Sequence, residues 1–148
     1  MIYLDTSAFL KLCFLETGSQ TVQDAVFVQD HPLPVWDILK AEMLDALQLK
    51  VFRKEISGKE AGHLTELFDV RLRKGQYYSP EIDRYALMTT SRKMSRRTPE
   101  TGCRTMDILH VACARNLRAD TFISFDDRQR PLAEAVGLNL VPGYTGGE

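Results

Sequence analysis

Long apolar runs are missing from this chain of 148 residues. No stretch approaches the roughly 20 consecutive apolar residues that a membrane-spanning helix requires. The first residues also lack the basic region of a secretory signal peptide, and Asp5 is the first charged side chain. We therefore expect a cytoplasmic protein with no membrane partner.

Cysteine and net charge are scarce as well. The three cysteines, Cys13, Cys103 and Cys113, are odd in number and show no Cys-x-x-Cys or zinc-ligand spacing, so neither a disulfide framework nor a structural zinc site is indicated. The formal net charge of -1 gives the molecule no general attraction to nucleic acid. Any binding of nucleic acid must depend on local basic patches.

What remains is the composition of an ordinary globular protein, with 44% hydrophobic and 26% charged residues. A chain of this length has room for one hydrophobic core. Because no repeat, low-complexity tract or interdomain linker is visible, we expect a single domain over residues 1–148.

Short apolar segments alternate with longer amphipathic ones. The pattern predicts strands at 2–5, 33–35, 77–79, 120–124 and 138–142. It predicts helices at about 6–16, 19–29, 36–54, 58–74, 80–94 and 105–117, and one more that ends at Gly137. Residues 95–104 are expected to form a mobile loop. Such alternation implies parallel crossovers, hence a three-layer α/β/α domain with a central, mostly parallel sheet.

Acidic residues follow two of the predicted strands. Asp5 ends the first strand, and Asp126 and Asp127 follow the strand at 120–124. In a parallel sheet, ligands gather at the carboxyl ends of the strands, so these acids share one site if the two strands are neighbours. The alternative is that each acid only caps the next helix, a role that Asp favours.

Glu42 is placed unusually for a glutamate. Its neighbours one and two turns along the predicted helix are Ile38, Leu39, Ala46 and Leu49, which places the carboxylate inside an apolar stripe. Burying an unpaired charge costs several kcal/mol. The sequence therefore predicts compensation by a distant arginine or by a bound cation.

Asp107 raises the same question at the start of the most apolar helix. The dipole of the helix favours an anion there by about 0.3–1 kcal/mol, which covers only part of the cost of burial. His110 shares the same face and is most simply a hydrogen-bonded structural residue. It could also support a site, contact a substrate or bind a metal ion.

Several carboxylates gathered in one cleft would repel one another unless a cation held them. Ligands that are all oxygen select hard ions such as Mg²⁺ or Mn²⁺. Thr6 and Ser7 would then orient a metal-bound water or support Asp5.

Four segments together resemble the PIN-domain ribonucleases of the VapC type, found in bacterial toxin–antitoxin pairs. The segments are "IYLDTSAFLK", "AEMLDALQLKVFRKEIS", "TMDILHVACA" and "ADTFISFDDRQRPLAEAVGL". They follow the order of the family along nearly the whole chain. The resemblance implies a PIN-like fold and a Mg²⁺- or Mn²⁺-dependent endoribonuclease. It also implies a homodimer and a small antitoxin whose tail blocks the acidic cleft.

The resemblance carries metal binding over to Asp5, Glu42, Asp107 and Asp126. Thr6 or Ser7 would supply polar support. Asp127 would be a fifth ligand or a cap. The basic stretch from Ser91 to Arg104 is longer than the family leads us to expect.

Our main hypothesis is hydrolysis of RNA phosphodiester bonds, with Arg92, Arg96 and Arg97 along the phosphate backbone, because the guanidinium fork matches phosphate oxygens. A solvated basic face is the alternative for these arginines. A rival enzyme is a phosphatase of the haloacid-dehalogenase type, but its second acid would stand at position 7, which is a serine. A non-catalytic module that binds a partner is the third hypothesis.

Overall fold

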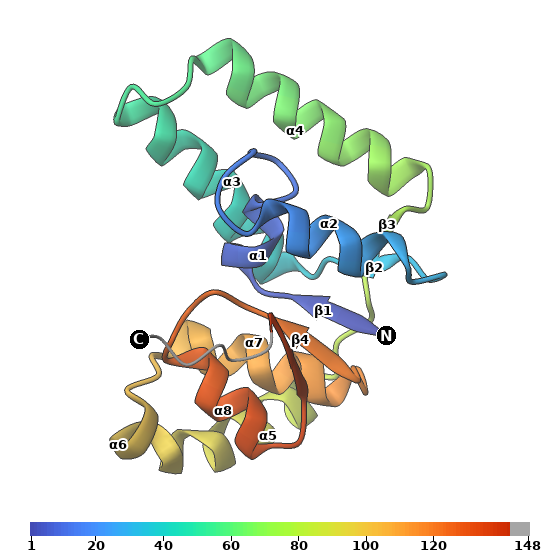
Figure 1. The fold of residues 1–148 in the computed structure, drawn as a ribbon. Helices are drawn as coiled ribbons and strands as arrows, with labels where there is room; N and C mark the ends of the chain where they lie inside the picture. Colours follow the sequence, from blue (N-terminus) through green and yellow to red (C-terminus); the bar gives the residue numbers. More distant parts are fainter. Residues whose placement is uncertain (143–148) are drawn as a thin grey trace. The chain divides into compact units, whose positions relative to one another are not determined.

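The computed structural model describes residues 1–142. The chain divides into two compact units, which we describe separately (Figure 1). Unit 1 comprises Met1–Asp30 and Glu81–Glu148, and unit 2 comprises His31–Pro80. The single domain expected from the sequence stays a prediction. Within the described residues, no helix is long and apolar enough to span a membrane.

Unit 1 is built on a parallel sheet of three strands. They are β1 (Ile2–Leu4), β4 (Thr121–Ile123) and β5 (Asn139–Val141), in the order β1-β4-β5. The rings of Tyr3 and Phe122 stack at the centre of this sheet, with centroids 5.6 Å apart, and both side chains are fully buried. Because β1 and β4 pair directly, the carboxyl ends of these two strands lie side by side.

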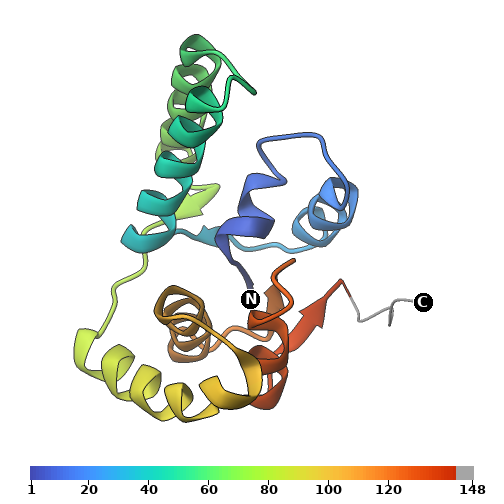
Figure 2. The same ribbon diagram turned by 90° about the vertical axis from the view of Figure 1, so that its left-hand side faces the viewer.

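Helices surround this sheet along the chain. They are α1 (Thr6–Leu10), α2 (Ser19–Phe27), α5 (Arg84–Met94), the 3₁₀ turn η1 (Ser95–Arg97), α6 (Thr98–Thr101), α7 (Thr105–Asn116) and α8 (Gln129–Ala135). Helix α7 is buried on nearly all sides, as the sequence predicts. Helix α5 packs along α7 with Leu87, Ser91 and Met94 buried (Figure 2).

Unit 2 pairs β2 (Leu33–Pro34) in parallel with β3 (Tyr77–Tyr78) and packs α3 (Asp37–Phe52) against α4 (Gly58–Arg73). The capping box predicted at the start of α4 is confirmed. Ser57 Oγ accepts a hydrogen bond from Glu60 N, and Glu60 Oε2 accepts one from Ser57 N at 2.7 Å.

The first helix is shorter than predicted, because it ends at Leu10 instead of near Glu16. The residues that follow form a turn whose backbone groups are bound by side chains. Ser19 Oγ donates to Phe14 O at 2.7 Å, and Lys11 Nζ donates to Thr17 O at 2.7 Å. These bonds replace the helical hydrogen bonds that a longer α1 would make.

The loop predicted at 95–104 is wrong, because residues 95–101 form η1 and α6. Pro99 fits the first turn of a helix, where its missing N–H leaves no bond unmade. Thr101 Oγ1 donates to Arg97 O at 3.1 Å, and Gly102 ends the helix with a φ of 68°. Helix α5 also begins four residues late, since Asp83 caps it through Ala86 N.

Candidate functional site

Asp5 lies directly after β1 and is only 2% exposed. Its Oδ1 accepts hydrogen bonds from Ala8 N and Ser7 Oγ, both at 2.8 Å, so the acid does cap α1. Burial raises the pKa of Asp5, and the hydrogen bonds from Ser124, Ala8 and Ser7 offset this only in part. Capping therefore explains the hydrogen bond of Oδ1, but it does not explain why the charged group is buried.

Ser124 occupies the corresponding position after β4. Its Oγ lies 2.6 Å from Asp5 Oδ2 and 3.2 Å from Gln129 Oε1, and it accepts a bond from Asp126 N at 3.0 Å. A hydroxyl has one proton to donate, and the shorter distance favours Asp5. Ser7 Oγ accepts a bond from Phe125 N at 3.0 Å. The ends of β1 and β4 are thus joined through two serine hydroxyls.

Asp107 lies in the first turn of α7 and is half-buried. Its Oδ2 accepts a hydrogen bond from Arg104 N at 2.7 Å, which satisfies the start of the helix. Its Oδ1 accepts a weaker one from Gln129 Nε2 at 3.4 Å. Gln129 therefore donates to Asp107 from its nitrogen, and its oxygen lies 3.2 Å from Ser124 Oγ, so this side chain lies between Asp107 and the hydrogen-bonded pair of Ser124 and Asp5.

His110 is buried and bridges α7 to the start of the chain. Its Nδ1 lies 2.8 Å from Tyr3 Oη, and its Nε2 lies 3.3 Å from Thr6 Oγ1. The two bonds fix Thr6 at the beginning of α1 and hold α7 against β1. This geometry matches the structural interpretation of His110.

Asp126 already has a cationic partner. Its Oδ2 lies 3.1 Å from Arg128 Nη2, and its Oδ1 accepts a bond from Arg128 N at 2.8 Å. Burial acts to raise the pKa of Asp126, but the bonds and charge of Arg128 outweigh it and lower the pKa. A metal ion at Asp126 would therefore compete with Arg128. Asp127 is exposed.

Glu42 belongs to unit 2, whereas the other predicted ligands belong to unit 1. Helix α3 buries Leu39, Met43 and Leu47, and Glu42 is half-buried next to this row. The apolar stripe proposed around Glu42 included Leu49, and this part is wrong because the side chain of Leu49 is 40% exposed. The buried row advances four residues at a time, and Glu42 lies at its edge.

The predicted RNA-binding arginines, Arg92, Arg96 and Arg97, are all exposed on α5 and η1. Arg97 Nη1 lies 3.7 Å from Glu100 Oε2 and so shares its charge with an acid.

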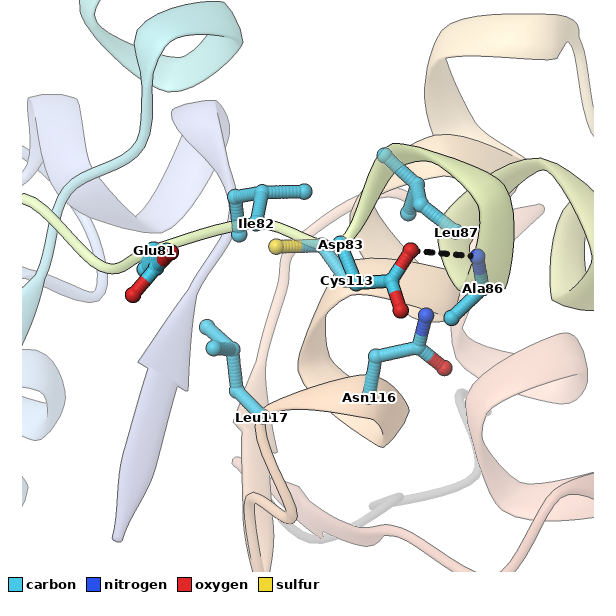
Figure 3. A pocket seen from close by; sticks show the side chains of 8 residues that line it. All are labelled: Glu81, Ile82, Asp83, Ala86, Leu87, Cys113, Asn116 and Leu117. Atoms are coloured by element: carbon cyan, nitrogen blue, oxygen red, sulfur yellow. Dashed lines mark hydrogen bonds between the residues drawn. The ribbon is translucent and has the colours of Figure 1, made fainter.

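A cavity of about 310 Å³ lies elsewhere in unit 1, between the start of α5 and the end of α7. Figure 3 shows its lining, which includes Asp83, Asn116 and Cys113. None of the acids described above lines it, and Asp83 is engaged in capping α5.

The oxygen donors of the network suit a hard cation. Within residues 1–142, no three Asp, Glu, His or Cys side chains form a group able to enclose a metal ion. Mg²⁺ commonly keeps several waters and is held by one or two carboxylates together with substrate phosphates. Two carboxylates, Asp5 and Asp107, are as many as that open mode of binding requires and too few for a closed site.

Three residues of the network were absent from the prediction: Ser124, Arg128 and Gln129. Ser124 could have been found from its place directly after a strand, since Asp5 occupies the corresponding position after β1. No comparable sequence signal exists for Arg128 and Gln129, because their contacts depend on how the chain turns from β4 into α8.

Comparison with known proteins gives one informative likeness. No family model and no curated protein matches the sequence. Among solved structures, the chain is similar to the crystal structure of FitAcB from Neisseria gonorrhoeae. The TM-score is 0.61 and the identity 16%, and the match covers 95% of this chain and 96% of that chain. The likeness shows the fold, and it confirms the α/β, PIN-like fold class with a central parallel sheet that the sequence predicts.

Proposed function

We propose that this protein is a metal-dependent endoribonuclease that hydrolyses RNA phosphodiester bonds. The observation that carries the proposal is the buried carboxylate of Asp5 at the end of β1, which Ser124 binds from the end of β4, with Gln129 lying between Ser124 and Asp107 of α7. Buried acids with a raised pKa are concentrated at functional sites. The fold shared with FitAcB supports the assignment.

Mg²⁺ or Mn²⁺ would be held by Asp5 and Asp107, with Asp126 and Asp127 as further acids of unit 1. Only the family resemblance adds Glu42, which belongs to unit 2. When bound, such an ion activates water and neutralises charge on the phosphate. Ser7 and Ser124 fix the orientation of Asp5, and Gln129 fixes that of Asp107. Thr6 and His110 hold α7 against β1, which keeps the two acids at the same end of the sheet.

The resemblance to VapC proteins extends the proposal to partners. We assign the chain as the toxin of a toxin–antitoxin pair, a cytoplasmic homodimer inhibited by a small antitoxin protein. Expression of the chain alone should arrest growth, and coexpression of the neighbouring small protein should relieve the arrest. Growth arrest that persists in the presence of the neighbour would contradict this pairing.

The phosphatase alternative fits less well. It requires an acid two residues after the nucleophile, and the structure places Ser7 there with its hydroxyl on Asp5. Trapping a phospho-aspartate at Asp5 would nevertheless establish it.

The direct test is cleavage of a structured RNA with Mg²⁺, with Mn²⁺ and with EDTA. We expect cleavage only with a divalent ion, and we expect Asp5→Asn to abolish it. Asp45→Asn is the matched control, because Asp45 is an exposed acid outside the network. Cleavage that survives EDTA, or wild-type turnover in Asp5→Asn, would remove the mechanism.

A further inference from the structure

The outward face of α5 carries an aromatic side chain followed by arginines. Tyr85 is 84% exposed, Met88 is 47% exposed, and Arg92 and Arg96 are exposed beyond them. Tyr85, Arg92 and Arg96 are spaced by seven and four residues, so a helical path places them on one side. Figure 2 shows α5 at the edge of unit 1, and its opposite face packs on α7.

This face is basic and has no acid of its own. Residues 84–97 contain no Asp or Glu and five Lys or Arg. Arg97 is paired with Glu100, but within residues 1–142 no ion pair involves Arg92, Lys93 or Arg96. These three cations are therefore available to an anionic partner.

The chain leads from this face to Asp107 through a short segment. After η1 the chain forms α6, which packs against α8, and Cys103 Sγ donates to Arg128 O at 2.9 Å. Arg104 follows, and its backbone N–H binds Asp107. The α5 face and the acidic network thus belong to the same unit and are joined by a short, ordered connection.

We propose that the outward face of α5 is a docking surface for single-stranded RNA, with Tyr85 stacking on a base and Arg92 and Arg96 contacting phosphates. This inference rests on the proposed ribonuclease function and names the form of substrate that it accepts. An exposed ring on a convex helix needs an unpaired base to stack on, whereas the bases of a duplex already stack on one another. Uncompensated cations beside the ring complement phosphate better than they complement an apolar protein surface.

The test measures binding of a fluorescent single-stranded RNA to the full chain in EDTA, with intact RNA verified on a gel. Tyr85→Ala should weaken binding about tenfold, and Tyr85→Phe should restore it, because stacking needs the ring and not the hydroxyl. Phe27→Ala is the matched control and should leave affinity unchanged, since Phe27 is 89% exposed on α2 and residues 12–39 contain no Lys or Arg.

A second measurement addresses the arginines. The double variant Arg92→Ala, Arg96→Ala should lower the slope of log affinity against log salt by about 1.4, at about 0.7 per phosphate contact for single strands. The same RNA annealed to its complement should bind without any dependence on Tyr85.

The proposal is overturned if Tyr85→Ala binds single-stranded RNA as the wild type does. It is equally overturned if Tyr85→Ala leaves RNA affinity intact and converts a dimer to a monomer in sedimentation, since the face would then be a protein interface. In both cases RNA cleavage by the wild type still upholds the proposed function. If the wild type neither binds nor cleaves RNA, both proposals fail.

Discussion

At the scale of the residue, the defining feature is an acid held by hydroxyls. Two serine side chains and one backbone amide bind Asp5, and burial still dominates its pKa. Hydrogen bonds replace only part of the hydration that a carboxylate loses on burial. In the metal-free protein, the ionised form of Asp5 therefore lowers the free energy of unfolding.

Stability should consequently depend on pH through Asp5. Because the folded-state pKa is raised, the folded protein holds this proton more tightly than the unfolded chain does, and stability falls as the pH rises through the raised pKa. Asp5→Asn cannot ionise, so its free energy of unfolding should exceed that of the wild type at neutral pH. Urea unfolding in EDTA at a series of pH values that starts below 3.8, the ordinary pKa of the side chain, and continues past neutral pH measures this. A difference between the two proteins that does not change with pH would refute it.

Ser124 should couple energetically to Asp5. Ser124→Ala removes the donor 2.6 Å from Asp5 Oδ2, and the loss of a hydrogen bond to a charged group costs about 1.5–3 kcal/mol. The loss should be smaller in an Asp5→Asn background, which a double-mutant cycle by urea unfolding reports. Ser79→Ala, at an exposed serine, serves as the control. Additive losses at Ser124 and Asp5 would count against the contact.

Cys113 should be chemically inert in the folded protein. It is fully buried, and burial raises its pKa to about 12, so almost no thiolate exists at neutral pH. In a labelling experiment with iodoacetamide, Cys13 should react first, because it is half-buried, and Cys113 should react only after unfolding in urea. Mass spectrometry of the peptides measures the labelling of each thiol. Equal labelling of Cys13 and Cys113 in the native protein would contradict the buried position of Cys113.

At the scale of the element, local chemistry explains which helices were predictable. Helix α4 has a capping box at its start, and Gly75 follows it with a φ of 70°, so its bounds were predicted almost to the residue. Helix α1 was not, because its end depends on bonds from Lys11 and Ser19 that form only in the folded turn. The helix α6 was missed because Pro and Gly usually mark loops, whereas here they begin and end one turn.

The capping box of α4 allows a prediction for unit 2. Ser57→Ala should lower the free energy of unfolding by about 1 kcal/mol, because the backbone N–H of Glu60 loses its acceptor. Ser57→Asp keeps an acceptor and should retain most of the stability. Circular dichroism during urea unfolding provides the comparison. Equal stability of Ser57→Ala and the wild type would show that the cap contributes nothing.

At the scale of the whole molecule, the order of strands and helices was predictable and the detailed contacts of the site were not. The alternating pattern predicts a parallel sheet, which β1, β4 and β5 form. The same pattern predicts that Asp5 and Asp126 follow strands, and the pairing of β1 with β4 shows that these strands are neighbours. The pairing of Asp126 with Arg128 and the bridging by Gln129 do not, because side-chain rotamers decide them. A fold shared at 16% identity shows how little of the sequence the architecture requires.

Divalent ions should stabilise the protein as a whole. An ion that binds only the folded state adds about 2.7 kcal/mol at one hundred times its Kd. Thermal unfolding with Mg²⁺ should therefore show a higher Tm for the wild type and no change for Asp5→Asn. Asp45→Asn should respond as the wild type does. No shift in any variant would favour the hypothesis of a non-catalytic binding module.

The pairing of β1 with β4 has a consequence for biosynthesis. Asp5 and Ser124 are 119 positions apart, so a ribosome adding roughly 5–20 residues per second needs about 6–24 seconds between them. During that interval the opening strand has no neighbour on which to form its ladder. The nascent polypeptide therefore cannot bring Ser124 to Asp5 before β4 has been translated, and premature termination before β4 would release a fragment that lacks this pairing.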